Sequence, residues 1–400
     1  MVNQTRSRDP VVIFGLSTEG YSVGKALSSQ GFSTMIIDEN LQMATDMQSP
    51  QISTYHNVAS LLEDEPLMAL IPMKEAISKA SSVFFAPKIR KSGEEGKAEL
   101  SSRLKDVAKH ISTGTIFFFL PAVGIGESEA NVALIEKVSG LKIMEDFHYA
   151  YAPFFPGETR PSVFGSSLQT FDKSKKSLLG LVGVNTSEVC SVAIAEQYYA
   201  KLVTQRLSHI AAELEAYKRI NDPYERMKFK KLADYSDTYP DDFANGLHDL
   251  RVFATSLDSG EPLLHIISGV TRCLEDYVRY LVGTIRDVIK TNELRASKTR
   301  VILAWSIDRY SMRGEKMNMQ ENILHRLRDL VNDVTVIQAV QDRNEQSSKF
   351  AGQIFSENKG TVIISCSVND QRSIDHMMPT ANAKIDTIVV KGNLLCEVSD

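Results

Sequence analysis

The stretch VVIFGLSTEG, residues 11–20, has the residue types of a dinucleotide-binding turn. An apolar run leads into Gly15, which suits a tight turn, and Gly20 suits close packing of a helix on a strand. Ser17 replaces the middle glycine of the G-x-G-x-x-G spacing, and its Cβ lies where the backbone should approach a pyrophosphate. Asp38 follows about 20 residues later, where a carboxylate reaches a ribose hydroxyl and repels a 2′-phosphate. The spacing therefore predicts an NAD site, with NAD favoured over NADP.

Two interpretations are compatible with this turn. In the first, the Ser17 hydroxyl donates a hydrogen bond to a phosphate and the turn binds NAD. In the second, Gly15 and Gly20 only shape the connection between strand and helix. Glu19 bears on the choice, because a negative charge near a helix N-terminus suits the helix dipole and opposes a bound diphosphate.

The turn belongs to a predicted strand–helix–strand unit. VVIFG is a continuous apolar run, as expected for a parallel strand covered on both faces, and STMIID gives the second strand. The helix between them ends at Gly31, a C-cap residue. Further strands are predicted over 81–87 and 114–121, with an amphipathic helix over 97–111. This alternation predicts a doubly wound α/β domain.

The pattern changes near residue 188. A stretch without Gly or Pro predicts one long helix up to about residue 220, and 261–290 gives a second helical region, with a polar, weakly patterned segment over 219–262. Strands and a helix return from residue 298, with strands over 299–306, 334–340, 360–367 and 386–392. We expect an α/β fold in which two doubly wound Rossmann-like domains, 1–187 and 298–400, are joined by a central helical domain, 188–297.

Composition restricts the function classes. The chain of 400 residues is 43% hydrophobic and carries a net charge of -5, which argues against general binding to nucleic acid or to membrane surfaces. The four cysteines, at 190, 273, 366 and 396, form no CxxC pair, and the eight histidines show no metal-ligand spacing. The N-terminal segment has no apolar run typical of a signal peptide. We expect a cytoplasmic protein with reduced thiols and no metal site.

The order of elements, together with seven local stretches, resembles the UDP-glucose/GDP-mannose dehydrogenase family. These stretches are VVIFGLSTEGYSVGKAL, SSVFFAP, PAVGIGESE, DFHYAYAPFFPGE, AIAEQYYAKLVTQRLSHIAAELE, VILAWSIDRYSMRGEK and KIDTIVVKGNLL. Enzymes of that family oxidise C6 of a nucleotide sugar to an acid with two molecules of NAD. The resemblance implies a nucleotide-sugar ligand and a homodimer formed through the long helix.

The residues that carry the family's chemistry differ in this chain. The family uses a Cys in a G-G-x-C loop, a Glu in a P-E loop, and a Lys and an Asn on the long helix. No Cys occurs from 191 to 272, and Cys273 follows on a predicted amphipathic helix. Phe154 stands at the Glu position, Tyr199 at the Lys position and Val203 at the Asn position. Lys201 is two residues from Tyr199, about 200° around a helix, and so points nearly the opposite way.

The third domain departs from the family pattern as well. Ser306 replaces its Lys and Ser311 its Asp, whereas Arg313 is retained and is the candidate for binding the substrate. A thiolate, a cation and a water-activating carboxylate have roles that Phe, Tyr and Val cannot take over.

Three hypotheses follow. The first is a pseudoenzyme that has lost the Cys-dependent oxidation and keeps a nucleotide or nucleotide-sugar binding role or an assembly role. The second is an NAD-dependent oxidoreductase of altered chemistry, in which Tyr198, Tyr199 or Lys201 exchanges a proton. The third is a true dehydrogenase that uses Cys273, and it predicts a thiol open to a cleft beside the cofactor.

Overall fold

The computed structural model describes residues 10–64, 69–158, 160–168, 170–184, 189–220, 222–232, 237–338, 360–377 and 387–398. The chain divides into two compact units. Unit 1 comprises Met1–Thr204, His248–Leu264 and Asp308–Gly314, and unit 2 comprises Gln205–Leu247, His265–Ile307 and Glu315–Asp400. Three of these boundaries fall within helices, and none falls at the predicted boundary 297/298. The predicted boundary 187/188 lies outside the described residues. The division into three domains stays a prediction.

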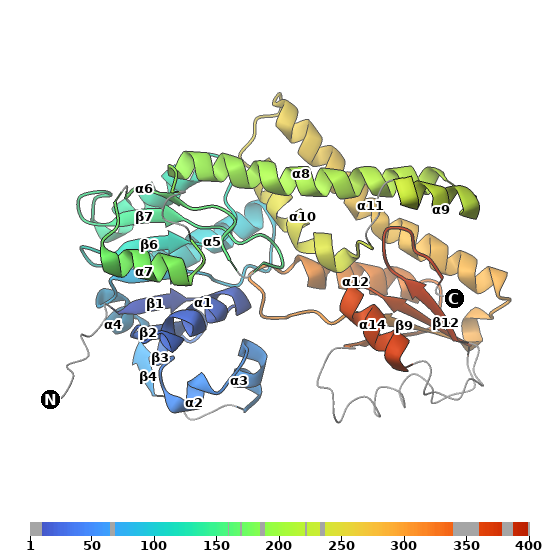
Figure 1. Cartoon of the computed structure of the whole chain (residues 1–400), viewed down its shortest axis with the longest axis horizontal. Helices are drawn as coiled ribbons and strands as arrows, with labels where there is room; N and C mark the ends of the chain where they lie inside the picture. The colour runs from blue at the N-terminus through green and yellow to red at the C-terminus, as the bar shows by residue number, and fades with distance from the viewer. Residues whose placement is uncertain are drawn as a thin grey trace. The chain divides into compact units, whose positions relative to one another are not determined.

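Unit 1 is built on a mixed sheet, which has eight strands among the residues described, in the order β4-β3-β2-β1-β5-β6-β7-β8 (Figure 1). Strands β2, β1, β5, β6 and β7 run parallel, and β3, β4 and β8 add antiparallel edges. The strands are β1 (Val11–Phe14), β2 (Thr34–Asp38), β3 (Met43–Asp46), β4 (Leu70–Pro72), β5 (Ser82–Phe85), β6 (Ile116–Phe119), β7 (His148–Tyr151) and β8 (Gly165–Ser166). The predicted doubly wound α/β fold is confirmed for this unit.

Helices cover both faces of this sheet, which explains its uninterrupted apolar strands. On one face, α1 (Thr18–Ser29) and α7 (Lys173–Leu181) share a core with Ile13, Phe84 and Phe118. On the other face lie α5 (Gly93–Ala108) and α6 (Glu127–Ser139), next to each other (Figure 1). The smaller helices of this unit are α2 (Pro50–Ser53), α3 (Val58–Asp64) and α4 (Met73–Ser78).

Unit 2 contains a second sheet, whose described strands are parallel in the order β10-β9-β11-β12. They are β9 (Thr299–Ala304), β10 (Asp333–Ile337), β11 (Gly360–Ser365) and β12 (Thr387–Lys391), with helices α12 (Glu315–Arg328) and α14 (Val368–Met377) packed on the sheet and a short 3-10 turn η1 (Ala296–Lys298). The predicted strands are confirmed where the structure describes them; residues 339, 340 and 386 lie outside the described part.

The predicted long helix is confirmed as α8 (Val192–Arg219), and the second helical region is α11 (Pro262–Thr291). The weakly patterned segment between them holds two further helices, α9 (Pro223–Leu232) and α10 (Pro240–Ala254), whose bounds the sequence did not predict. The start of α10 carries a recognisable signal, since Pro240 is followed by Asp241 and Asp242 in the first helical turn.

In the part of the chain that the structure describes, no helix is long and apolar enough to cross a bilayer. The same residues contain no group of three or more His, Cys, Asp or Glu side chains placed to hold a metal ion.

Candidate functional site

The glycine turn has the geometry that the sequence predicts. Gly15 adopts a φ of +112°, in the region that favours glycine, and a Cβ there would overlap the backbone carbonyl of Ala86. At Gly20 a Cβ would lie 3.0 Å from both the Gly15 carbonyl oxygen and Ser17 Oγ. Gly15 is therefore required by close approach of the backbone, and Gly20 leaves little room for a side chain, as expected for a turn that joins β1 to α1.

The Ser17 hydroxyl makes hydrogen bonds within the turn, both as donor and as acceptor. Its side chain is fully buried; Oγ donates to the Ala86 carbonyl at 2.6 Å and accepts the Gly20 N–H at 3.1 Å. Ser17 is thus the N-cap of α1. Because its only hydroxyl proton goes to Ala86, it has none left to donate to a phosphate in this arrangement.

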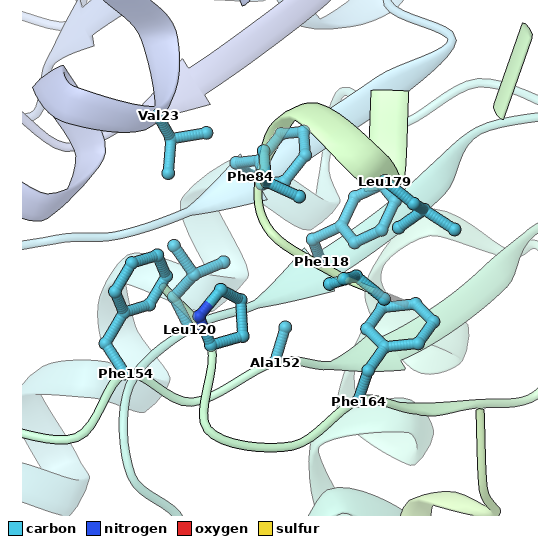
Figure 2. Close-up of a pocket in the computed structure, with 11 residues that line it drawn as sticks. Val23, Phe84, Phe118, Leu120, Ala152, Phe154, Phe164 and Leu179 are labelled. Atoms are coloured by element: carbon cyan, nitrogen blue, oxygen red, sulfur yellow. The ribbon is translucent and has the colours of Figure 1, made fainter. Parts of the chain in front are cut away.

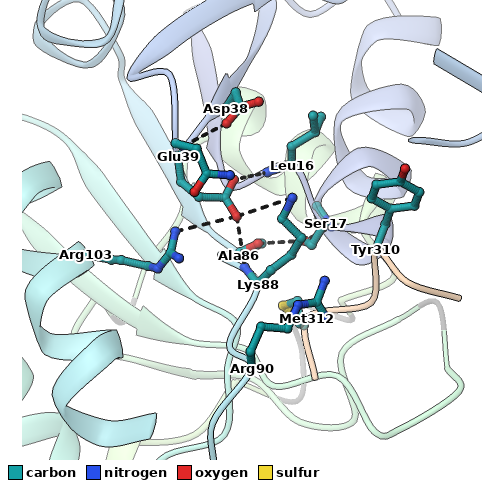
Figure 3. A network of polar contacts seen from close by, with 12 residues as sticks. Leu16, Ser17, Asp38, Glu39, Ala86, Lys88, Arg90, Arg103, Tyr310 and Met312 are labelled. Atoms are coloured by element: carbon teal, nitrogen blue, oxygen red, sulfur yellow. Dashed lines mark hydrogen bonds and ion pairs between the residues drawn. The ribbon is translucent and has the colours of Figure 1, made fainter. Parts of the chain in front are cut away.

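Glu39 places a carboxylate on the turn, and the sequence analysis did not single it out. One oxygen accepts the Leu16 N–H at 2.7 Å, and the other accepts the Lys88 N–H at 3.3 Å. The ammonium of Lys88 and the guanidinium of Arg103 lie 3.8 and 3.7 Å from that second oxygen, and the Glu39 side chain has no exposed surface (Figure 3). A carboxylate bound by backbone N–H groups and two cations occupies the kind of site that such a turn offers to a phosphate.

Asp38 also binds locally. Its Oδ1 accepts the N–H groups of Asn40 (2.8 Å) and Leu41 (3.3 Å), and so closes the turn after β2. The role predicted for Asp38, binding a ribose, stays a prediction. Glu39 could have been found from its place in the sequence, since it directly follows β2, and parallel strands β1 and β2 end at the same edge of the sheet.

The first residues of α1 contact the segment Asp308–Gly314, which belongs to unit 1. The Thr18 N–H donates to the Tyr310 carbonyl at 2.9 Å, and the Glu19 carboxylate accepts from Met312 N–H (2.8 Å) and Ser311 Oγ (3.1 Å). Burial raises the pKa of Glu19, in spite of the opposing charge of Arg313 and these hydrogen bonds.

Three backbone donors at the start of α1 consequently have partners within the chain. The Leu16 N–H binds Glu39, the Thr18 N–H binds the Tyr310 carbonyl, and the Gly20 N–H binds Ser17 Oγ. These are donors that a helix N-terminus presents to an anion. The turn has the shape of a dinucleotide site, but these three N–H donors are already bound to partners within the chain.

A second polar cluster surrounds Arg313. Its Nε and one terminal nitrogen bind the two oxygens of Asp249 at 2.7 and 2.8 Å, a bidentate ion pair. The same terminal nitrogen lies 2.7 Å from the Phe154 carbonyl oxygen and 2.9 Å from the Tyr199 hydroxyl, and that hydroxyl is 2.6 Å from Asp249 Oδ2. All four residues are buried. We call Phe154, Tyr199, Asp249 and Arg313 the Arg313 cluster.

Charge fixes the protonation states in this cluster. Burial opposes ionisation of Asp249, but the charge of Arg313 and hydrogen bonds from His248 and Arg313 lower the pKa of Asp249 to about 2. Burial and the charge of Asp249 raise the pKa of Tyr199 well above its ordinary value. The pKa of Arg313 is also raised: burial lowers it, but the charges of Asp249 and Tyr199 outweigh that effect. Near neutral pH the cluster is a closed Arg–Asp pair with a neutral phenol.

Neither a protein-family model nor a curated protein sequence gives a significant match to this chain. Solved structures do match over nearly the whole length. The UDP-D-ManNAc dehydrogenase of Pyrococcus horikoshii is 14% identical, covering 97% of this chain and 96% of that chain, with a TM-score of 0.64. The UDP-glucose dehydrogenase of Pyrobaculum islandicum is 15% identical, covering 98% and 96%, with a TM-score of 0.57. The UDP-N-acetyl-mannosamine dehydrogenase of Staphylococcus aureus is 13% identical, covering 89% and 88%, with a TM-score of 0.58.

This chain has the nucleotide-sugar dehydrogenase fold. The resemblance found in the sequence is confirmed at the level of the fold. Identity this low says nothing about chemistry, which depends on the residues at the site.

Within the nucleotide-sugar dehydrogenase fold, three positions assigned from the sequence converge. Phe154, Tyr199 and Arg313 come from distant parts of the chain and meet within hydrogen-bonding distance. The fourth member, Asp249, lies on α10, the helix that sequence reasoning missed. Its signal was the spacing of Phe243, Leu247, Leu250 and Phe253, which places apolar side chains on one helix face.

Phe154 contributes only its carbonyl to the polar cluster. Its ring lines an apolar cavity of only about 10 Å³, together with Leu120, Ala152 and Phe164 (Figure 2). Phe154, the residue that the sequence resemblance matches to the family's P-E glutamate, is therefore part of the hydrophobic core.

Other predicted residues lie apart from the cluster. Lys201 is exposed and sits 5.9 Å from the ring of Tyr198, whose side chain is also exposed, while Tyr199 is buried; this confirms that Lys201 faces away from Tyr199. The Cys273 thiol lies 3.4 Å from both the Ala211 carbonyl and a Glu215 carboxylate oxygen on α8. Burial, with Glu215, raises the pKa of Cys273 to about 12, so the reactive thiolate is scarce near neutral pH.

Proposed function

We propose that this protein is a non-catalytic relative with the nucleotide-sugar dehydrogenase fold, which has lost the Cys-dependent, NAD-linked oxidation of nucleotide sugars. The observation that carries the proposal is the Glu39 carboxylate on the Leu16 N–H, flanked by Lys88 and Arg103. A diphosphate at this turn would have to displace a buried carboxylate and would then lie beside its charge. Both effects oppose binding of a dinucleotide.

The Arg313 cluster supports the same proposal. Oxidation of an alcohol to an acid requires a nucleophilic thiolate, an oxyanion stabiliser and a group that activates water. Arg313 is bound bidentately by Asp249, and the neutral Tyr199 hydroxyl donates within the same cluster. The raised pKa of Cys273 also disfavours the nucleophile of the third hypothesis.

Of the roles that remain, assembly has the better support. Ile194 and Tyr198 lie one turn apart on α8 and leave large apolar side chains about half exposed, at 59% and 48%. Adjacent exposed apolar residues favour a protein contact. We propose that the chain forms a homodimer through this part of α8, as the family resemblance implies. Binding of a nucleotide sugar through Arg313 has less support, because Arg313 is buried with Asp249.

A turnover assay with a binding control tests the proposal. The purified protein is mixed with UDP-glucose and NAD, and reduction is followed at the nicotinamide absorbance band. We expect no reduction and no saturable uptake of NAD in a calorimetric titration. Reduction of NAD with UDP-glucose would overturn the proposal. Reduction only with other sugars or hydroxy acids would favour the alternative, an oxidoreductase of altered chemistry.

A further inference from the structure

A pocket separate from the glycine turn lies between α5 and α6. Its cavity volume is about 90 Å³, and it includes residues that follow β6 and residues of α10. Most of its walls are apolar, with Leu100, Val123, Leu134 and Val252 among them. We call it the α5–α6 pocket. A mostly apolar lining with few polar groups is typical of pockets that hold small organic molecules.

The polar groups at one side of this pocket bind each other. Lys97 pairs with Glu127, and a Glu127 oxygen also accepts the Gly124 N–H at 3.1 Å. Burial is incomplete there, since 42% of the Lys97 side chain is exposed. This pair offers a ligand little further hydrogen bonding, so specificity has to come from another group.

His248 is that group. It lines the pocket from α10, and only 7% of its side chain is exposed. Its Nδ1 lies 3.2 Å from Asp249 Oδ1, and because the Asp249 carboxylate is ionised, Nδ1 carries the proton. In neutral His248 the other nitrogen, Nε2, is then a hydrogen-bond acceptor. Among the described residues Nε2 has no hydrogen-bond partner, although it is buried.

A buried acceptor without a partner is unusual in a folded protein, and it needs a donor from outside the chain or from water. Nδ1 is turned toward Asp249, so Nε2 lies on the ring edge away from that carboxylate, in a side chain that lines the pocket. We propose that the α5–α6 pocket binds a small, mainly apolar molecule that carries one hydroxyl or N–H donor, and that His248 Nε2 accepts its hydrogen bond. This inference does not depend on the state of the glycine turn.

Two matched probes test the proposal. p-Cresol has an apolar ring and one hydroxyl donor, and 4-methylanisole is the same molecule with the hydroxyl methylated. Both are titrated into the full-length protein, with binding followed by ligand-observed NMR. We expect p-cresol to bind about fivefold more tightly, the value of one net hydrogen bond. In the variant His248→Asn, whose amide keeps a donor near the Nδ1 position, this preference falls to about one.

A second pair of variants locates the site on α6. Ala130 lines the pocket, whereas Ala133 is exposed on the same helix and does not line it. We expect Ala130→Phe to abolish binding of both probes and Ala133→Phe to leave binding unchanged. If His248→Asn fails to fold, the wild-type preference and this alanine pair decide. Absence of saturable binding, equal affinity of wild type for both probes, a preference retained in His248→Asn, or equal effects of the two alanine variants would overturn the proposal.

Discussion

The glycine turn and the α5–α6 pocket differ in how their polar atoms are used. At the turn, the N–H groups of Leu16, Thr18 and Gly20 all bind partners within the chain. In the pocket, buried His248 Nε2 has no partner among the residues that the structure describes. The comparison teaches that the N–H donors of a dinucleotide-type turn can all be bound within the chain, whereas the apolar pocket keeps one acceptor without a partner. A shared fold therefore does not decide which polar groups are left to bind a ligand.

The largest effect is expected from disrupting the Arg313 cluster, in which Arg313 of segment 308–314 binds Asp249 of α10. Arg313→Met leaves the buried Asp249 carboxylate without its cation, and we expect the free energy of unfolding to fall by about 3–5 kcal/mol. Urea denaturation followed by circular dichroism measures the loss.

Two further variants complete this test: a control at an exposed arginine, and a double variant that removes the unpaired charge. Arg309→Met removes an exposed arginine from the same segment, and we expect a change below about 0.5 kcal/mol. Adding Asp249→Leu to Arg313→Met removes the unpaired charge and should restore part of the stability. A loss below about 1 kcal/mol for Arg313→Met would show that the cluster does not stabilise the fold.

The next effect concerns the turn itself. Gly15→Ala introduces a Cβ at a φ of +112° that overlaps the Ala86 carbonyl, and we expect a loss of roughly 3 kcal/mol. The control is Gly31→Ala, where φ is +79° but no heavy atom lies within 4 Å of the new Cβ. Its cost should be about 1 kcal/mol, which reflects backbone conformation alone. Equal losses for the two variants would contradict the close approach at Gly15.

A smaller effect is expected from pH. The pKa of Asp249 is about 2 in the folded chain, below its ordinary value of 3.8, so folding favours the ionised form. The resulting stability is fully present well above pH 3.8 and is lost as pH falls through 3.8 toward 2, by about 2 kcal/mol in all. Unfolding of wild type and Asp249→Asn is measured between pH 6 and pH 2. The stability difference between them should shrink by this amount; a difference independent of pH would contradict the ion pair.

The sequence predicted those features that depend on local pattern. Apolar runs located β1, β5 and β6, helical spacing showed that Lys201 faces away from Tyr199, and the turn required Gly15. It could not predict where the side chain of Glu39 points, because strand order places the residue at the sheet edge without fixing its rotamer. The role of Asp249 could not be predicted, because its partner Arg313 lies 64 positions away and meets it only in the folded chain. Strands β3 and β7 lack the continuous apolar runs of β1, β5 and β6, and the edge strands β4 and β8 have only three and two residues, too few for a clear pattern.

The most direct test of the central claim asks whether Glu39 keeps anions from the glycine turn. Inorganic pyrophosphate and NAD are titrated by calorimetry at low salt into wild type, Glu39→Ala and Glu75→Ala. Glu75 is an exposed partner of Lys79, so its replacement gives the same change in net charge away from the turn. We predict no saturable binding to wild type or Glu75→Ala, and at least tenfold tighter pyrophosphate binding to Glu39→Ala, because the Leu16 N–H, Lys88 and Arg103 then face the anion. Micromolar binding of NAD to the wild-type protein would contradict the account.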